Sequence, residues 1–430
     1  MNVWPEVRAS GRSADLQPRE ILPNAWGTDR VKGAVMDTLQ AAREDFADVV
    51  ELTRELIRVP SRGGIDPYDP VLGIMAAWLG RHDLACRRLA GPGGSVLALT
   101  CEISGERPGP RYVLDACLDT APFGDEAAWT YPPLSGKITD GWLHGRGSSD
   151  SKAGAAIFAH VAARLRDMAG GFGGSVVLLY DVDEHTGGFG GAKAYFEGAG
   201  APDRVDGVMI GYPGMDHLIT GGRGVLRARV QVHATAGHSG SRQGEAGAIA
   251  KAADLVRALR DMALPGPAGP GFPLPARLTV TAISGGQGYS MVPDLCTVSV
   301  DIRLTPGLDD LGADALLRGA AASVDAAWPG TRPTSIEVTT RWPAYALQDG
   351  SPLRDALLQA AQSAGLAPVA KVAGPSNIGN YLAGLGIPAT AGFGVDYQGL
   401  HGTDERIRLG SIPAVQAAYH QALLTLLHAA

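Results

Sequence analysis

Four short segments of this sequence carry the residue types that acid–base and metal chemistry require. They contain Cys117 and Asp119, then Asp150, then Asp183, Glu184 and His185, and finally His401, Asp404 and Glu405. Each segment follows an apolar run or lies in a loop. Because the carboxyl ends of strands in an open α/β sheet converge on one crevice, we expect the four segments to meet there.

Three of these residues satisfy the ligand requirement of a hydrolytic zinc site. Zinc binds nitrogen, oxygen and thiolate ligands, and a catalytic ion keeps about three protein ligands plus water. Asp150, His185 and His401 provide such a set. Glu184 stands beside His185, where its carboxylate can take the proton of a water that the metal has made more acidic. Taken alone, each histidine is more simply explained as a loop residue bonded to the backbone.

The elements that position these residues alternate between strands and helices. Helical spacing of apolar residues predicts helices at 37–57, 71–79, 153–168, 353–364, 378–385 and 411–428. Strands are predicted at 95–103, 111–114, 175–182, 207–210 and 387–392. The run 175–182 is continuously apolar, which is typical of a strand buried on both faces. We therefore predict an α/β layer with a mostly parallel or mixed sheet.

A different pattern interrupts this layer in the middle of the chain. A half-solvated strand is predicted at 225–235, followed by a helix at 245–262, strands at 277–283 and 296–304, a helix at 308–328 and a strand at 335–340. The order β-α-β-β-α-β is typical of a small two-layer α+β domain of the ferredoxin-like kind. We divide the chain into an N-terminal extension (1–36), a first part of the main domain (37–216), the inserted domain (217–344) and a second part of the main domain (345–430).

The composition is typical of a globular protein and argues against nucleic-acid and membrane partners. The 430 residues are 45% hydrophobic and 19% charged, as in a globular protein with a sizeable core. The net charge of -7 and the absence of a Lys/Arg-rich run argue against nucleic acid as a partner. No apolar stretch is long enough to cross a bilayer, so we expect no membrane partner. The four cysteines lack zinc-finger spacing, and a reducing cytoplasmic location is expected.

Several motifs, taken in order along the chain, resemble those of the aminoacylase-type family of zinc metallopeptidases and deacylases. That family includes acetylornithine deacetylase, succinyl-diaminopimelate desuccinylase and glutamate carboxypeptidase. The motifs here are DACLDTAP (115–122), DGWLHGRGSSDSK (140–152), DEHTGG (183–188), GYP (211–213), ATAGHS (234–239), SMVP (290–293), DIR (301–303) and GVDYQGLHGTDE (394–405). The resemblance implies a zinc-peptidase-like catalytic domain whose inserted domain serves as a lid and dimerisation domain.

The resemblance also shows where this chain departs from the family's metal ligands. Members usually hold two zinc ions, bridged by the aspartate that corresponds to Asp150. One ligand position of the first ion is Cys117 here and another is Tyr212, which is a poor ligand, whereas His185 replaces a glutamate of the second ion. We therefore expect one zinc ion rather than two, with Cys117 as an additional candidate ligand. Asp119 corresponds to a carboxylate that orients a histidine at position 117, so we expect its partner to be lost.

Four further residues receive roles from the resemblance alone. His238 matches a lid histidine that reaches the active site of a partner subunit and stabilises the oxyanion. Arg303 matches an arginine that binds a substrate carboxylate. Ser290 stands where the family often has asparagine, and Asn377 lies in a loop that resembles one framing the substrate. These matches imply a homodimer with a small-molecule or peptide substrate.

Three functions remain open at this point. The first, which we favour, is a metal-dependent hydrolase that cleaves an amide bond of an N-acylated amino acid or small peptide, with Glu184 as base. The second is a biosynthetic acyltransferase or cyclase that uses Cys117 as a nucleophile or ligand. The third is an inactive scaffold or binding protein. Retention of Glu184 and the exchange of one ligand type for another favour an active metal site over an inert one.

Overall fold

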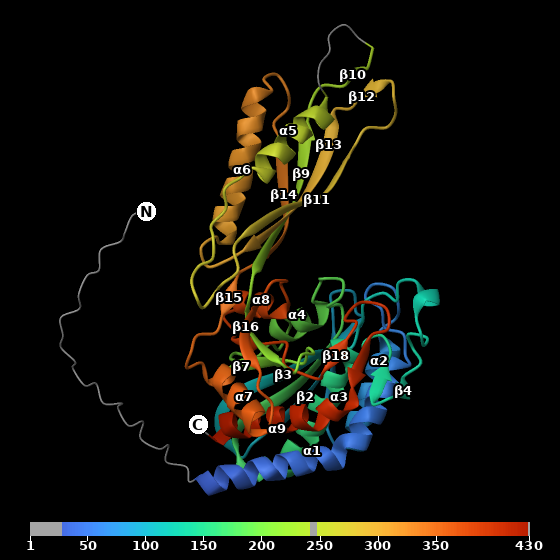
Figure 1. The fold of residues 1–430 in the computed structure, drawn as a ribbon, viewed down its shortest axis with the longest axis vertical. Helices are drawn as coiled ribbons and strands as arrows, with labels where there is room; N and C mark the ends of the chain where they lie inside the picture. The colour runs from blue at the N-terminus through green and yellow to red at the C-terminus, as the bar shows by residue number, and fades with distance from the viewer. Residues whose placement is uncertain (1–27, 241–246, 429–430) are drawn as a thin grey trace, which may run out of the picture.

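The computed structural model describes residues 28–240 and 247–428. They form an α/β domain and a smaller domain that rises above it (Figure 1). The predicted fold class, an α/β catalytic domain with an inserted two-layer α+β domain, is confirmed. Within the described ranges, no helix is both long and apolar enough to span a membrane.

The α/β domain is built on a six-stranded mixed sheet with the order β1-β2-β6-β3-β7-β17. Its strands are β1 (Cys86–Ala90), β2 (Val96–Ser104), β3 (Arg107–Cys117), β6 (Gly173–Asp181), β7 (Gly207–Ile210) and β17 (Ala389–Thr390). The last four strands in that order are parallel to one another, β2 runs antiparallel to β6, and β1 runs antiparallel to β2. The parallel strands β3 and β6 therefore end at the same edge of the sheet, with Cys117 opposite Asp181.

Helices cover both faces of this sheet. One apolar cluster contains residues of α1 (Thr28–Ile57), α2 (Asp69–Arg81), α3 (Ala153–Asp167), α7 (Pro352–Ser363) and α9 (Ile412–His428). A second cluster, on the other face, contains residues of α4 (Gly190–Phe196) and α8 (Ile378–Gly384). In β6, Leu178 packs in the first cluster and Leu179 in the second, which confirms the prediction of a strand buried on both faces.

Two small sheets hold loops from distant parts of the sequence together. One contains β18 (Tyr397–Gln398), β19 (Arg406–Arg408), β5 (Trp142–His144) and β4 (Lys137–Thr139), in that order. The other contains β15 (Tyr345–Ala346), β8 (His217–Gly222) and β16 (Val369–Ala373). Since Arg406 pairs with His144, the segment that follows β5 lies beside the segment that precedes β19.

The inserted domain, called the lid below, is a four-stranded antiparallel sheet backed by two helices. Its elements are β9 (Gly224–His233), α5 (Ala248–Arg260), β11 (Arg277–Gly285), β13 (Leu295–Leu304), α6 (Asp310–Ala327) and β14 (Ser335–Trp342). The order β11-β13-β9-β14 is that of a ferredoxin-like sheet. Residues that alternate along β13, such as Val298 and Val300, pack against the helices in a separate core. A pair of short strands, β10 (Gly237–His238) and β12 (Met291–Val292), lies at the far end of the lid (Figure 1).

The structure differs from the prediction at element boundaries and in several strands that were not predicted, among them β1 and β16. Helix α1 begins at Thr28 rather than at 37, while residues 1–27 of the predicted extension lie outside the described residues. Strand β17 covers only Ala389–Thr390 of the predicted 387–392. Strand β8 was not predicted, and it pairs with β15 and β16 rather than with the lid sheet. We therefore propose that the lid begins at Gly224 rather than at 217.

Candidate metal centre and active site

The ends of β3 and β6 deliver the first part of the site. Asp119 follows β3 and is completely buried. Its Oδ1 accepts a hydrogen bond from the backbone N–H of Glu184 at 3.3 Å, and its Oδ2 accepts one from the backbone N–H of His185 at 3.0 Å. The Nδ1 atom of His185 lies 3.4 Å from the same Oδ2. The segment after β6 is therefore fixed on the carboxylate that follows β3.

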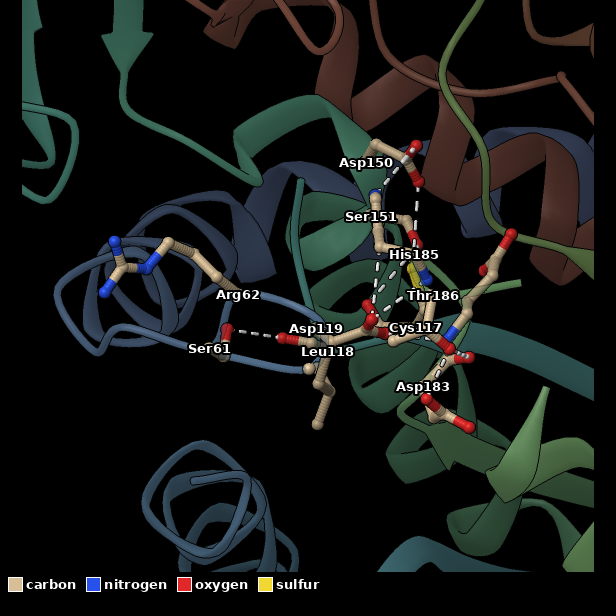
Figure 2. Close-up of polar contacts among 12 residues, drawn as sticks. Ser61, Arg62, Cys117, Leu118, Asp119, Asp150, Ser151, Asp183, His185 and Thr186 are labelled. Carbon is tan, nitrogen blue, oxygen red and sulfur yellow. Dashed lines mark hydrogen bonds and ion pairs between the residues drawn. The ribbon is translucent and has the colours of Figure 1, made fainter. Parts of the chain in front are cut away.

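The paired strands β5 and β19 deliver the second part. Asp150 lies after β5 in the short segment η2 (Ser148–Lys152), where its own backbone angles are not helical, and the peptide bond that joins it to Ser151 is cis. His401 precedes β19, and its Nε2 lies 2.8 Å from Oδ2 of Asp150. The Nε2 atom of His185 lies 3.6 Å from the same oxygen. Figure 2 shows His185 between Asp150 and Asp119, so one imidazole faces both carboxylates.

Two groups of potential metal ligands result from this arrangement. Asp150, His185 and His401 offer one oxygen and two nitrogen atoms, and Cys117, Asp119 and His185 offer a sulfur, an oxygen and a nitrogen atom. In each group the ligand atoms lie within 4.8 Å of one another. Because nitrogen, oxygen and thiolate atoms are the ligands that zinc prefers, the residues present suit this metal. The set predicted from the sequence is thus brought together.

A buried ion pair joins the loops of Asp150 and His401. Arg146 and Glu405 lie 2.6 Å apart, and their side chains are 2% and 1% exposed. The other oxygen of Glu405 accepts hydrogen bonds from the backbone N–H and the hydroxyl of Ser149, while Arg146 also donates to the carbonyl of His401. Both ion-pair partners belong to the sequence motifs that carry the ligands, yet the pairing itself was not predicted.

Burial and opposite charges govern the electrostatics of the site in the absence of metal. Burial alone would lower the pKa of His185, but Asp119 and Asp150 on either side raise it to about 11. Burial opposes ionisation of Asp150, but His185 and His401 lower the pKa of its carboxyl below its usual range. Burial, together with Asp150, raises the pKa of Glu184. A positive charge between the two aspartates is therefore strongly favoured, as in a cation site.

Cys117 lies beside the site, and its side chain is buried. Its Sγ is 3.3 Å from Oγ of Ser151 and 3.7 Å from Oδ1 of Asp150. Burial raises the pKa of the thiol, and the carboxylates of Glu184 and Asp150 raise it further. A thiolate at this position therefore requires a metal ion or another cation nearby. Tyr212 packs against the apolar cluster around α4 and α8.

Two buried carboxylates beside Cys117 were not identified as part of the site. Asp115 and Asp181 are each 1% exposed, and among the described residues neither carboxylate has a hydrogen-bond partner. Burial raises the pKa of Asp115 to about 8, and burial together with Asp115 raises that of Asp181. The sequence feature that could have identified them is a single aspartate within each of two apolar strands. The raised pKa values favour the protonated, neutral form of both carboxyl groups, and Asp181 lies opposite Cys117 in the sheet.

The four residues predicted from the lid and its neighbouring loop lie outside both ligand groups. His238 is exposed on β10, and Ser290 accepts a backbone hydrogen bond from Ser239 in the same region. Arg303 lies on β13, where it pairs with Asp301 at 2.7 Å and donates to the hydroxyl of Ser376 at 3.2 Å. Asn377 follows Ser376 and caps the N-terminus of α8. Arg303 is thus held against the loop predicted to frame the substrate.

Known proteins match this chain in sequence and in fold. Residues 113–425 match the profile of peptidase family M20/M25/M40. A succinyl-diaminopimelate desuccinylase 2 from Ruegeria sp. (strain TM1040) is 29% identical over 278 residues, which cover 62% of this chain and 68% of the relative. A succinyl-diaminopimelate desuccinylase from Rhodospirillum centenum is 26% identical over 389 residues, or 87% of this chain and 96% of the relative. The crystal structure of aminopeptidase PepT from Bacillus cereus has a TM-score of 0.70 at 18% identity and covers 89% of this chain and 98% of its own; this likeness shows the fold.

Proposed function

The chain belongs to peptidase family M20/M25/M40, whose members are metal-dependent hydrolases of amide bonds, and we propose that it cleaves an N-acylated amino acid or small peptide at a single zinc ion. Asp150, His185 and His401 would hold the metal. The observation that carries this proposal is the convergence of these three side chains around Oδ2 of Asp150. Burial raises the pKa of Glu184, and its carboxylate lies close enough for Asp150 to raise this pKa further and for His185 to lower it.

The roles of the residues follow from their positions. Bound at this site, zinc supplies a Lewis acid that polarises an amide carbonyl and makes water more acidic. Glu184 accepts the proton of the attacking water and then donates it to the leaving nitrogen, for which a carboxylate with a raised pKa is well suited. The Arg146–Glu405 pair keeps the loops of Asp150 and His401 together while the charge at the site changes.

Recognition of the substrate is proposed for the region between the lid and the α/β domain. Arg303 presents a guanidinium that suits a substrate carboxylate, and its bond to Ser376 ties the lid to the loop that leads into Asn377. Two relatives at 26–29% identity are named for the removal of a succinyl group. We therefore propose that the substrate of this chain is an N-acylated amino acid of the same broad class. Ser290, beside the tip of the lid, would contact substrate when the lid closes.

Assembly and location are proposed on separate grounds. His238 is exposed on the lid and has no contact with either ligand group of its own chain among the described residues, which suits a role in the site of a second subunit. We propose a homodimer on this basis, which sedimentation of the purified protein would test. The four cysteines are free, which supports a reducing cytoplasmic environment.

Hydrolysis of a panel of amides tests the proposed function. N-succinyl, N-acetyl and dipeptide substrates should be compared with the zinc-loaded protein and with protein stripped by a chelator. We expect release of the free amine from at least one N-acylated amino acid, lost after chelation and restored by zinc. Hydrolysis that continues at the same rate without metal, or no hydrolysis of any member despite bound zinc, would contradict the proposal.

A further inference from the structure

We propose that Asp119 is a positioning residue for His185: its carboxylate accepts a hydrogen bond from Nδ1–H and thereby leaves Nε2 to bind the metal ion that Asp150 and His401 also bind. The inference rests on the proposed metal site and adds to it the partner of one ligand. It assigns His185 as the hydrogen-bond partner of Asp119, because position 117, where a histidine partner was expected, is a cysteine in this chain.

The two nitrogen atoms of His185 face different carboxylates. Nε2 lies 3.6 Å from Oδ2 of Asp150, on the side of His401. Nδ1 lies 3.4 Å from Oδ2 of Asp119, on the opposite side. Nδ1 is buried and has no hydrogen bond among the residues that the structure describes. Asp119 is therefore the carboxylate placed to satisfy it.

Asp119 is held rigidly enough to set the orientation of the ring. Its side chain is fully buried, and its two oxygens accept the backbone N–H groups of Glu184 and His185. A Cβ atom on Gly63 would lie 3.0 Å from both Oδ2 of Asp119 and Cβ of His185, so the loop at Gly63 closes directly over the pair. Close packing keeps water from competing for Nδ1.

The consequence for metal binding is a fixed tautomer. A neutral imidazole has one donor and one acceptor nitrogen, and the hydrogen bond on one side determines which nitrogen is free for the metal. A carboxylate behind a metal-bound histidine orients the ring and raises its basicity, and losing it typically costs about 10–100-fold in metal affinity. Cys117 has no ring nitrogen, so Asp119 is available for this role.

Nitrogen NMR of His185 in the zinc-loaded wild-type protein tests the tautomer without any substitution. The expected result is a proton on Nδ1 and a metal-bound Nε2, assigned by comparison with His185→Gln. Metal on Nδ1 would overturn the inference, because Asp119 would then be a ligand neighbour rather than a hydrogen-bond acceptor.

A double-mutant cycle on zinc affinity tests the coupling between the two residues. Zinc affinity would be measured by competition with a chromophoric chelator for wild type, Asp119→Asn, His185→Gln and the double variant. We expect Asp119→Asn to weaken zinc binding by about 10–100-fold in the wild-type background and to have little effect in the His185→Gln background. Equal losses in both backgrounds would overturn the inference, since they would indicate a general structural effect.

Two controls separate this inference from the proposed metal site. Asp115→Asn changes another buried carboxylate next to the site and should leave zinc affinity unchanged. If His185→Gln and His401→Ala weaken zinc binding but the cycle shows no coupling, the inference fails and the metal site stands. If neither substitution weakens zinc binding, both the inference about Asp119 and the proposed metal site fail.

Discussion

The guanidinium of Arg146 lies 2.6 Å from the carboxylate of Glu405, and both side chains are almost completely removed from solvent. The pair connects the turn that carries Asp150 with the loop that carries His401, although the two partners are far apart in sequence. Because the ion pair joins the two segments, we expect it to support the geometry of the site as well as the stability of the fold.

Breaking this pair should affect stability and metal binding together. Arg146→Met leaves Glu405 buried without its cation, and such a loss typically costs about 3–5 kcal/mol. We expect a drop of this order in the free energy of unfolding of the metal-free protein and weaker zinc binding by the folded variant. Urea unfolding and chelator competition measure the two effects. Arg341→Met, which removes the exposed partner of Asp310, should cost less than about 1 kcal/mol. Similar losses in both variants would contradict the assigned role.

Glu184→Gln separates catalysis from metal binding. The carboxamide cannot accept the proton of the attacking water, so we expect the turnover rate to fall by about 10²–10⁴-fold. Zinc content, measured by atomic emission, should stay the same, because Glu184 belongs to neither ligand group. The matched change Glu197→Gln, at a carboxylate bonded to Tyr381, should leave the rate unchanged. Full activity of Glu184→Gln would exclude it as the base.

Cys117→Ser distinguishes hydrolysis from acyl transfer through the thiol. Because burial raises the pKa of Cys117 above its ordinary value, the free protein should hold a protonated, poorly nucleophilic thiol. We expect iodoacetamide to modify the half-buried Cys86 faster than Cys117, and we expect Cys117→Ser to retain zinc and hydrolysis. A substrate-derived acyl group found on Cys117 by mass spectrometry of the intact protein would instead support the transferase function.

The burial of His420 should make the folded protein less stable at mildly acidic pH. Burial, assisted by Arg164, lowers the pKa of this histidine to about 4 in the folded protein, whereas the unfolded chain has an ordinary pKa of about 6.5. As the pH falls through 6.5 the unfolded state takes up the proton first, so stability decreases until about pH 4. The loss in the free energy of unfolding caused by His420 reaches about 3 kcal/mol near pH 4 and is absent above pH 7.

The His420 effect is measured by comparing variants at two pH values. Urea unfolding of the metal-free wild type and of His420→Leu at pH 7 and pH 5 gives the difference that belongs to this residue. We expect a smaller loss between the two pH values in His420→Leu. An equal loss in both proteins would show that His420 is not the group that titrates.

The sequence was most informative where one residue type or one periodicity had a single physical explanation. The apolar run that ends at Val182 predicted β6, and the convergence of parallel strand ends predicted that His185 would meet Asp150. The order of strands and helices predicted the ferredoxin-like inserted domain, and the resemblance identified the family; both the family and the fold are confirmed. Roles within the site stay proposals.

The remaining features depend on contacts that leave no periodic pattern. The pairing of Arg146 with Glu405 joins distant side chains, and nothing in either motif indicates which cation meets which carboxylate. The loss of an expected histidine at Cys117 suggested that Asp119 had no partner, whereas the structure places His185 beside it. Short strands such as β8 were missed because a few residues carry too little alternation to distinguish them from loops.

Anomalous X-ray diffraction at the zinc edge, from crystals of the protein as purified, tests the central claim most directly. We predict one strong peak in each chain, about 2.0–2.2 Å from Oδ2 of Asp150, Nε2 of His185 and Nε2 of His401. A peak of equal height bound to Cys117 would refute the single-ion site, and a zinc-supplemented crystal with no peak between His185 and His401 would refute the metal centre itself.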